Sequence, residues 1–221
     1  MLHAVSAGNG SPPTLCGVCV TTLRVGGAGV TVVADGGPPA TLCASNPLAG
    51  RIEELQYVMG EGPGVDAHAA GAPVAEPDLD APRRLRWPLF TRSAVAAGAG
   101  ALFAFPLRTG AVRLGALTLH QPRAGLLSDA QHADALALAD VVMQVVVARQ
   151  AGAHPGALAE GLEPLATGPA EIHQAAGMIS VQLSVSVAEA LVRLRARAFR
   201  DGRPLADLAA DVVARRIRLG P

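Results

Sequence analysis

The amino-acid sequence predicts an α+β fold, an antiparallel sheet flanked by helices, followed by a small all-α domain of three helices. Two observations predict this. Between residues 14 and 150, strand and helix patterns follow one another in an order typical of α+β proteins. Between residues 169 and 221, three short amphipathic patterns each have their own start and stop signals. We therefore expect a disordered N-terminus at 1–13, one domain at 14–150, a linker at 151–168 and a helical domain at 169–221.

The elements of the first domain follow from β-branched runs, turn residues and helical periodicity. A hairpin is expected around Thr109-Gly110, and the long helix Ser128–Gln150 begins with a capping box formed by Ser128 and Gln131. The expected elements are a helix at 14–23, strands at 29–35 and 40–45, a helix at 47–57, a loop at 60–64, an extended piece at 73–75, a helix at 87–96, strands at 101–107 and 112–120, and the long helix.

The three C-terminal helices are recognised by their ends and their apolar stripes. The first opens at Pro169 and carries Gly177 as a small face for close approach. In the second, Ser186 and Glu189 form a capping box, and the helix ends at Gly202. The third starts at Pro204, with arginines in its last turn. The residues expected to face inward are Ile172, Ala175, Ala176, Ile179, Leu183, Ala190, Leu191, Leu194, Ala198, Leu205, Leu208, Ala209, Val212 and Val213.

This C-terminal block resembles the ANTAR domain, the RNA-binding module of bacterial transcription antitermination regulators. Many members have Lys where this chain has Ala176, so no phosphate contact is expected there. The resemblance implies binding to hairpins in nascent RNA. It rests on Gln174-Ala175-Ala176-Gly177-Met178, Glu189-Ala190-x-x-x-Leu194-Arg195-x-x-Ala198, Gly202-Arg203-Pro204-Leu205 and Ala209-x-x-Val212-Val213.

The first domain resembles a GAF domain of the kind joined to ANTAR in actinobacterial regulators. The resemblance implies a sensor with a small-ligand pocket lined by Asp66, His68, Trp87 and Phe90. In the alternative interpretation Trp87 fills the space over the sheet and there is no ligand. The motifs are Leu55-Gln56 before Gly60-Glu61-Gly62-Pro63, Asp66, Arg86-Trp87-Pro88, and Pro106-Leu107 before Leu114-Gly115-Ala116-Leu117.

The charge distribution restricts where RNA contact is expected. The formal net charge is zero, with 18 basic and 18 acidic residues, so the chain as a whole does not attract a polyanion. Binding therefore requires a local patch. The segment 171–221 contains more Arg than acidic residues, so it can supply this patch. A solvated face is the alternative interpretation. The candidate RNA-binding residues are Gln174, Arg193, Arg197, Arg200, Arg203, Arg215 and Arg216.

No catalytic residue, metal site or cofactor is expected. Cys16-x-x-Cys19 lacks the second half of a metal site, and Cys43 stands alone, so we expect three reduced thiols, with Cys16 and Cys19 buried as small apolar groups. The glycine-rich loop 60–64 lacks the Lys of a phosphate-binding loop. Two alternatives remain: a three-helix protein- or DNA-interaction module, and a methionine sulfoxide reductase of the GAF fold that uses cysteine thiols.

Location and assembly are expected from the apolar segments. The N-terminus shows no secretion signal, and Leu136–Ala148 is too short to span a bilayer, so a cytoplasmic protein is expected. After Asp140 the helix 128–150 is apolar almost all round, which predicts a homodimer through this helix with Val142 and Val146 in the contact. Together these patterns predict a cytoplasmic, non-enzymatic GAF–ANTAR antitermination regulator that senses a signal and binds RNA as a homodimer.

Overall fold

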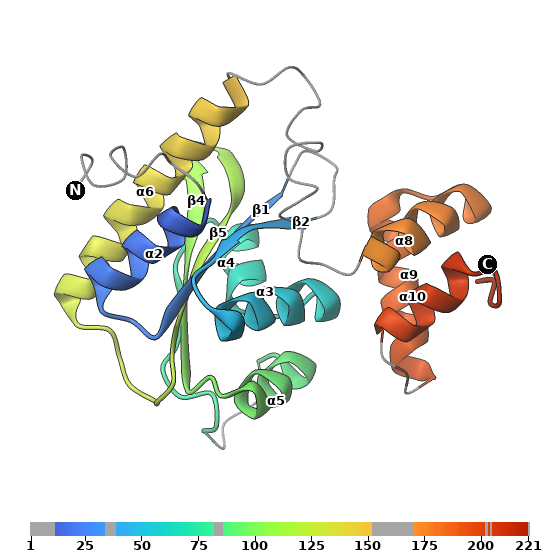
Figure 1. Ribbon diagram of the computed structural model, residues 1–221, viewed down its shortest axis with the longest axis horizontal. Coiled ribbons are helices and arrows are strands. Elements are labelled where there is room, and N and C mark those ends of the chain that lie inside the picture. Colours follow the sequence, from blue (N-terminus) through green and yellow to red (C-terminus); the bar gives the residue numbers. More distant parts are fainter. Residues whose placement is uncertain are drawn as a thin grey trace. The chain divides into compact units, whose positions relative to one another are not determined.

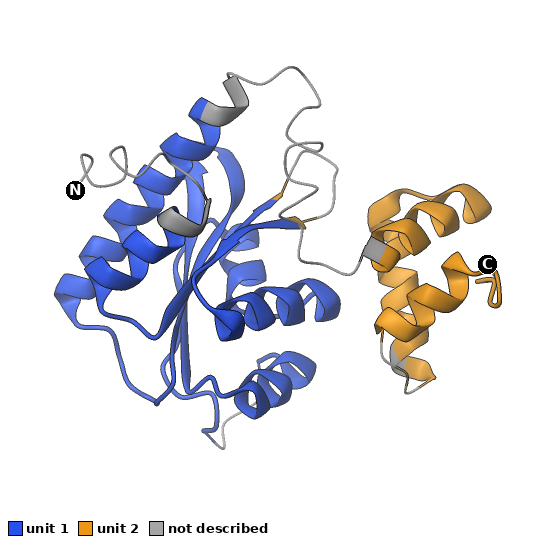
Figure 2. Cartoon of the chain, viewed as in Figure 1, with its two compact units in different colours: residues 1–32, 40–166 blue, residues 33–39, 167–221 orange. Residues whose placement is uncertain are grey.

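The structure, a computed structural model, describes residues 12–33, 39–81, 86–151, 170–201, 203 and 205–220. The chain forms two compact units, 1–32 with 40–166 and 33–39 with 167–221 (Figure 2). We call them the first and the second unit. The expected N-terminal segment 1–13 and the expected linker 151–168 lie almost wholly outside the described residues, as do Pro169, Gly202 and Pro204.

The first unit is built on a five-stranded sheet in the order β2-β1-β5-β4-β3. The pairs β1–β5, β4–β5 and β3–β4 are antiparallel, and the expected hairpin is formed by β4 and β5. The antiparallel sheet and the α+β class are therefore as predicted. The strands are β1 (Gly27–Val33), β2 (Pro39–Ala44), β3 (Val74–Glu76), β4 (Ala101–Thr109) and β5 (Val112–Gln121).

Helices cover both faces of this sheet (Figure 1). Phe103 and Phe105 of β4 pack with helices α2 (Pro12–Leu23) and α6 (Asp129–Ala151) on one face. Leu102 and Ala104 pack with the opposite layer, because successive strand side chains point to opposite faces. That layer consists of α3 (Pro47–Met59), α4 (Pro63–Ala70) and α5 (Pro88–Ala97).

Helix α4 was not expected, because residues 60–64 were interpreted as a loop. Gly60, at φ 66°, ends α3, and Gly62, at φ 135°, precedes the first turn of α4 with Pro63. The helix has eight residues, PGVDAHAA, and no apolar periodicity. Its register is instead fixed by tertiary contacts, including a hydrogen bond of 2.6 Å from the Gly64 amide to Gln56 Oε1.

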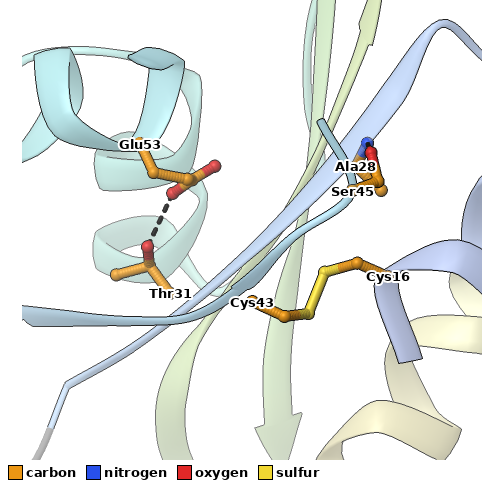
Figure 3. The surroundings of a disulfide bond; sticks show 6 residues. All are labelled: Cys16, Ala28, Thr31, Cys43, Ser45 and Glu53. Atoms are coloured by element: carbon orange, nitrogen blue, oxygen red, sulfur yellow. Dashed lines mark hydrogen bonds between the residues drawn. A yellow bond between two sulfur atoms is a disulfide. The ribbon is translucent and has the colours of Figure 1, made fainter. Parts of the chain in front are cut away.

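The cysteines differ from the prediction. Cys16 of α2 and Cys43 of β2 form a disulfide, with Cα atoms 6.1 Å apart (Figure 3). The expectation of three reduced thiols is therefore wrong for these two residues. Cys19 is a free thiol, and burial raises its pKa to about 11. The pairing depends on how α2 packs on the sheet, which the spacing of the cysteines does not reveal.

Helix α6 begins as predicted. The Ser128 amide donates to Gln131 Oε1 at 2.9 Å, and the Gln131 amide donates to Ser128 Oγ at 3.2 Å. Gln131 Nε2 also donates to the Leu23 carbonyl oxygen at 2.7 Å. This last bond ties the first turn of α6 to the end of α2.

The sequence analysis expected Val142 and Val146 of α6 to lie in a dimer contact, and this expectation is wrong. Val142 and Val146 lie in the core that α6 shares with the sheet and α2. Helix α2 packs in the same core as α6, and the sequence analysis did not predict this packing. The outer side keeps Leu136, which is 40% exposed, and Val147, which is 43% exposed, beside exposed Asp140.

Among the described residues, Asp129–Ala148 of α6 is the one helix long and apolar enough to cross a membrane by length and composition. Core helices of soluble proteins pass the same test. Here Leu138, Val142 and Met143 pack in the core of the first unit. The apolar character of α6 is thus explained by its position against the sheet.

The second unit consists of three helices, as predicted: α8 (Ala170–Leu183), α9 (Val187–Arg200) and α10 (Leu205–Val213). Their buried faces carry the expected apolar residues, except that Leu183 and Val213 are only partly buried. Two details differ. The Glu189 amide donates to Ser186 Oγ at 3.1 Å, but the Glu189 carboxylate pairs with Arg193 instead of completing the capping box. Arg215 and Arg216 lie beyond the end of α10, not in its last turn.

Candidate functional site

Three of the candidate RNA-binding residues lie on α9, and each is next to a carboxylate. Arg193 pairs with Glu189 at 2.8 Å. Arg197 pairs with Asp201, and Arg200 lies 3.6 Å from the same carboxylate. The hydrogen bond from Arg197 lowers the pKa of Asp201 below its usual value. Exposed ion pairs of this kind are weak, so these arginines are partly neutralised but not locked in place.

Arg203 and Arg216 lie on either side of α10 in the chain, and both form ion pairs with Asp211 of that helix. Arg203 Nη2 lies 2.6 Å from Asp211 Oδ2, and Arg216 Nη2 lies 2.7 Å from Asp211 Oδ1. Hydrogen bonds from Arg203 and then Arg216 lower the pKa of Asp211. The clamp joins the residues just before α10 to the residues just after it. The predicted RNA-binding residues Arg203 and Arg216 thus also form ion pairs within the second unit.

The chain turns back after α10. Arg215 adopts φ 59°, a left-handed conformation that usually falls to glycine, and its amide donates to the Val212 carbonyl oxygen at 2.9 Å. Leu219 is buried, and its carbonyl oxygen accepts from Gln182 Nε2 of α8 at 3.1 Å. The tail 214–220 is thereby anchored to α8. Within the described part of the chain, no ion pair holds Arg215 or Arg218.

A groove of about 730 Å³ lies between α8 and this tail. On α8 its residues recur at helical spacing on one face, and Val181 among them is 83% exposed. The groove brings two of the predicted residues together, Gln174 and Arg215, whereas Arg193, Arg197 and Arg200 are not among its lining residues. It is lined by Gln174, Gly177, Met178, Val181, Gln182, Val212, Arg215, Ile217 and Arg218.

The sequence analysis did not single out Met178, Val181 or Gln182 as binding residues. A signal was present, since Val181 and Gln182 continue the spacing of Gln174 and Gly177 along one face of the helix. Val181 lies outside the buried stripe of α8. The opposite wall was not foreseeable, because it depends on the return of the tail after Arg215.

In the first unit, three of the four predicted ligand-binding residues lie together. Trp87 Nε1 donates to Asp66 Oδ2 at 3.1 Å, and Arg86 Nη2 lies 3.0 Å from the same oxygen. The Arg86 guanidinium stands 5.0 Å from the centre of the Trp87 ring. Trp87 and Phe90 meet edge to face, with ring centres 6.2 Å apart, and both are buried in an apolar cluster with Ile52. The two rings thus fill the space between this helical layer and the sheet.

The fourth predicted residue, His68, has different neighbours. It is half-buried on α4, and its Nδ1 has no hydrogen-bond partner among the described residues. Burial first, and the charge of Arg113 second, lower the pKa of His68, whereas a backbone hydrogen bond with Gly115 raises it. Arg113 also donates to the His68 and Ala69 carbonyl oxygens. His68 is therefore held near β5 in its neutral form.

The structure shows a buried polar cluster that the sequence analysis missed. Glu53 of α3 is only 3% exposed, and its Oε2 accepts from Thr31 Oγ1 at 2.6 Å (Figure 3). Gln56 Nε2 donates to Thr118 Oγ1 at 3.3 Å. A Cβ atom on Gly29 would come within 2.6 Å of Glu53 Oε1, so glycine makes room for the carboxyl group.

Burial raises the pKa of Glu53 to about 7, and hydrogen bonding by Thr31 and Thr118 offsets only part of this effect. Glu53 Oε1 makes no well-formed hydrogen bond within the described ranges. The cluster therefore holds a carboxyl group that changes its charge near neutral pH. In the sequence Glu53 looks like a residue of the outer face of an amphipathic helix, next to exposed Arg51.

Clusters of metal ligands and free thiols are sparse in the described residues. No group of three or more His, Cys, Asp or Glu side chains that could hold a metal ion occurs among them. Cys19 is buried with a raised pKa, so it is a thiol and not a reactive thiolate at neutral pH.

Residues 167–213 match the ANTAR domain family. The GAF domain of a phosphoenolpyruvate-protein phosphotransferase from Acinetobacter has a TM-score of 0.50 at 12% identity, covering 69% of this chain and 86% of that chain. The GAF domain of a phosphoenolpyruvate-protein phosphotransferase from Coxiella burnetii has a TM-score of 0.48 at 14% identity, covering 65% and 84%. A free methionine-R-sulfoxide reductase from Thermoplasma acidophilum has a TM-score of 0.45 at 16% identity, covering 62% and 92%. No curated protein matches the chain.

These comparisons show the two folds. The first unit has a GAF-like fold, with an antiparallel sheet flanked by helices, as expected. The second unit carries an ANTAR domain. The predicted GAF–ANTAR architecture is therefore confirmed, and the kind of protein that it supports is a regulator.

Proposed function

We propose that this protein is a signal-responsive, RNA-binding regulator of transcription antitermination. The observation that carries the proposal is the match of residues 167–213 to the ANTAR domain, on a folded three-helix unit. In this proposal the second unit binds a hairpin in nascent RNA and prevents a terminator from forming. The GAF-like unit receives the signal, either a small ligand or a protein partner.

The charges of the second unit support RNA as the partner. Arg193, Arg197 and Arg200 give α9 a basic face, although carboxylates lie beside them. Arg215 and Arg218 have no such carboxylate among the described residues and lie at the groove. Sequence-specific RNA recognition uses unpaired bases, which stack on guanidinium or aromatic groups, together with phosphate contacts. A neutral chain with a locally basic second unit fits this mode.

The assembly that we propose is a cytoplasmic homodimer with no enzymatic activity. Two-fold pairing of α6 with its copy would bury Leu136 and Val147 of both chains in one isologous contact. Two ANTAR domains would then be available to one RNA molecule. A thiol-dependent reductase is disfavoured, because Cys19, the free thiol among the described residues, is buried and its pKa is raised.

The test is a selection for RNA with the full chain. The probe is a pool of RNA hairpins whose loops have randomised sequence. We expect loop sequences to be enriched over successive rounds, with binding that weakens as the salt concentration rises. A pool of DNA hairpins with the same stems serves as the control. Enrichment from the DNA pool alone, or from neither pool, would contradict the proposal.

A further inference from the structure

We propose that the groove between α8 and the tail 214–220 binds an unpaired nucleobase of the RNA, with the base lying over Gly177. The inference rests on the proposed function, which it deepens by naming the site and the chemical group that occupies it. Four observations carry it: the shape of the groove, the glycine in its α8 wall, the state of its arginines, and the chemistry of its rim.

The shape suits a small planar group. Gln174, Gly177, Met178 and Val181 lie on one face of α8 at positions i, i+3, i+4 and i+7, and Ile217 faces them from the tail. The volume of about 730 Å³ falls in the usual range for small-molecule sites. The groove therefore has apolar side chains against which the face of a base can pack.

The presence of glycine at position 177 is not explained by contacts or backbone conformation within the described residues. Gly177 lies in the interior of α8, where glycine is less favourable than alanine because it costs more conformational entropy. It does not adopt a positive φ, and a Cβ atom built on it would meet nothing within 4 Å. Neither backbone geometry nor packing within the described residues requires glycine here. A group from outside the chain that approaches the helix closely would require it.

The arginines at the groove differ from five other arginines of this unit. Arg193, Arg197, Arg200, Arg203 and Arg216 each lie beside a carboxylate. Arg215 and Arg218 are exposed without an ion pair in the part of the chain that the structure describes. Arg215 also holds a left-handed conformation, φ 59°, that is strained for any residue with a side chain. The second unit thus keeps an uncompensated guanidinium at the groove despite a local strain.

The rim favours RNA over a protein segment. Two unpaired cations beside an apolar surface are complementary to a base that is joined to phosphates, since a guanidinium can stack on the base or bind the phosphate. Gln174 is exposed at the groove and carries both a donor and an acceptor for a base edge. Gln182 Nε2 is already used by the Leu219 carbonyl oxygen, so it helps to hold the tail in place.

Two substitutions separate binding from folding. Gly177→Ala should raise the melting temperature, because alanine is the better helix former, while the added methyl group intrudes on the base. Arg215→Gly should also raise the melting temperature, because glycine relieves the left-handed strain, while the guanidinium is lost. We expect both full-length variants to bind the selected hairpin RNA more weakly. A purely structural role would predict the opposite, since more stable variants would bind at least as well.

Larger changes give larger effects. Gly177→Leu fills the groove and should weaken binding by an order of magnitude, roughly the loss of one stacked base. Arg218→Ala should lower the slope of log affinity against log salt by about one. Arg51→Ala, which removes an exposed arginine that is paired with Glu54 on α3 of the first unit, is the matched control and should change affinity by less than about twofold.

The measurements are fluorescence titration of each full-length variant with the hairpin RNA that the wild-type chain enriches, and thermal unfolding of the same samples. Photo-crosslinking of that RNA, with 5-iodouridine in the loop, should label a groove residue such as Met178. Wild-type affinity of Gly177→Ala, Arg215→Gly and a folded Gly177→Leu would overturn the groove while leaving the proposed function intact. A pool that yields no RNA would overturn both. Loss of a dimer in Gly177→Leu with unchanged RNA binding would assign the groove to protein and overturn the inference.

Discussion

Glu53 shows how one buried residue makes stability depend on pH. Burial raises its pKa in the folded protein from 4.5 to about 7. Between these values the unfolded chain releases its proton, whereas the folded chain keeps it. The contribution of Glu53 to stability is therefore greatest below pH 4.5 and falls as the pH rises to about 7, above which no more of it is lost. The shift corresponds to a loss of about 3 kcal/mol at most.

We expect Glu53→Gln to remove most of this loss. The amide keeps the shape of the side chain, and its oxygen can still accept from Thr31 Oγ1, but it never ionises. Urea unfolding at pH 5 and pH 8 should show a smaller decrease in unfolding free energy for the variant than for the wild type. Glu54→Gln, which changes the neighbouring and more exposed carboxylate, is the control. Equal pH dependence of the wild type and Glu53→Gln would show that this carboxyl group is not the cause.

The cysteines give a second prediction at the scale of single residues. Cys16 and Cys43 are joined, and Cys19 is buried with a pKa of about 11. Iodoacetamide near neutral pH should therefore label the native, unreduced protein slowly or not at all. Denaturation without reductant should expose one thiol, and denaturation with reductant should expose all three cysteines. Rapid labelling of the native protein, read by mass spectrometry, would point to a reactive thiolate and revive the reductase alternative.

At the scale of elements, we expect the basic face of α9 to add to the electrostatic attraction of the second unit for RNA. Replacing Arg193, Arg197 and Arg200 with Ala removes three positive charges and leaves Glu189 and Asp201 without these partners. We expect the helices to stay folded, while RNA binding weakens and its salt dependence becomes flatter. Gel-shift titrations at two salt concentrations measure this. Arg51→Ala on α3 removes an ion pair from the GAF-like unit and should leave binding unchanged. If the triple variant binds like the wild type, the face is only solvated.

The dimer prediction can be tested by substitutions on the exposed side of helix α6. Changing both Leu136 and Val147 to Glu alters its outer side and should convert a dimer into a monomer, with helix content retained. Val142→Glu, in contrast, places a charge in the core and should unfold the first unit. Light scattering at micromolar concentration, with circular dichroism, distinguishes these outcomes. A monomer mass for the wild-type chain would rule out the proposed homodimer.

At the scale of the whole molecule, the two units are expected to be separable. The segment from Gln150 to Gly168 carries four Gly and two Pro, which predicts a soft linker. A Glu-specific protease should therefore cut at Glu160 or Glu163 first and release two stable pieces. Cleavage is followed by gel and by mass. Resistance of both sites under conditions that cleave the denatured chain would show that the segment is part of one packed body.

The sequence by itself determined most of the local structure of this protein and its division into two folds, although helix α4 was not among the predicted elements. Helix caps, the 3.6-residue period and strand alternation depend on residues within a few positions of one another, so Ser128 with Gln131 could be read directly. The same holds for the apolar stripes of the three C-terminal helices. The spacing of motifs such as Gln174 to Met178 supported the ANTAR resemblance, which the family match confirms.

Only the tertiary structure decided the features that join distant residues. Cys16 meets Cys43 across 27 positions, Gln131 meets Leu23 across 108, and Gln182 meets Leu219 across 37. No local pattern encodes such pairs, because their distance depends on how whole elements pack. Three further features arise in this way. Glu53 of α3 is buried, α2 packs with α6, and the chain after α10 forms one wall of the groove. Packing thus gives the buried Glu53 its raised pKa, and it leaves the groove beside α8 as a space that the described residues do not fill.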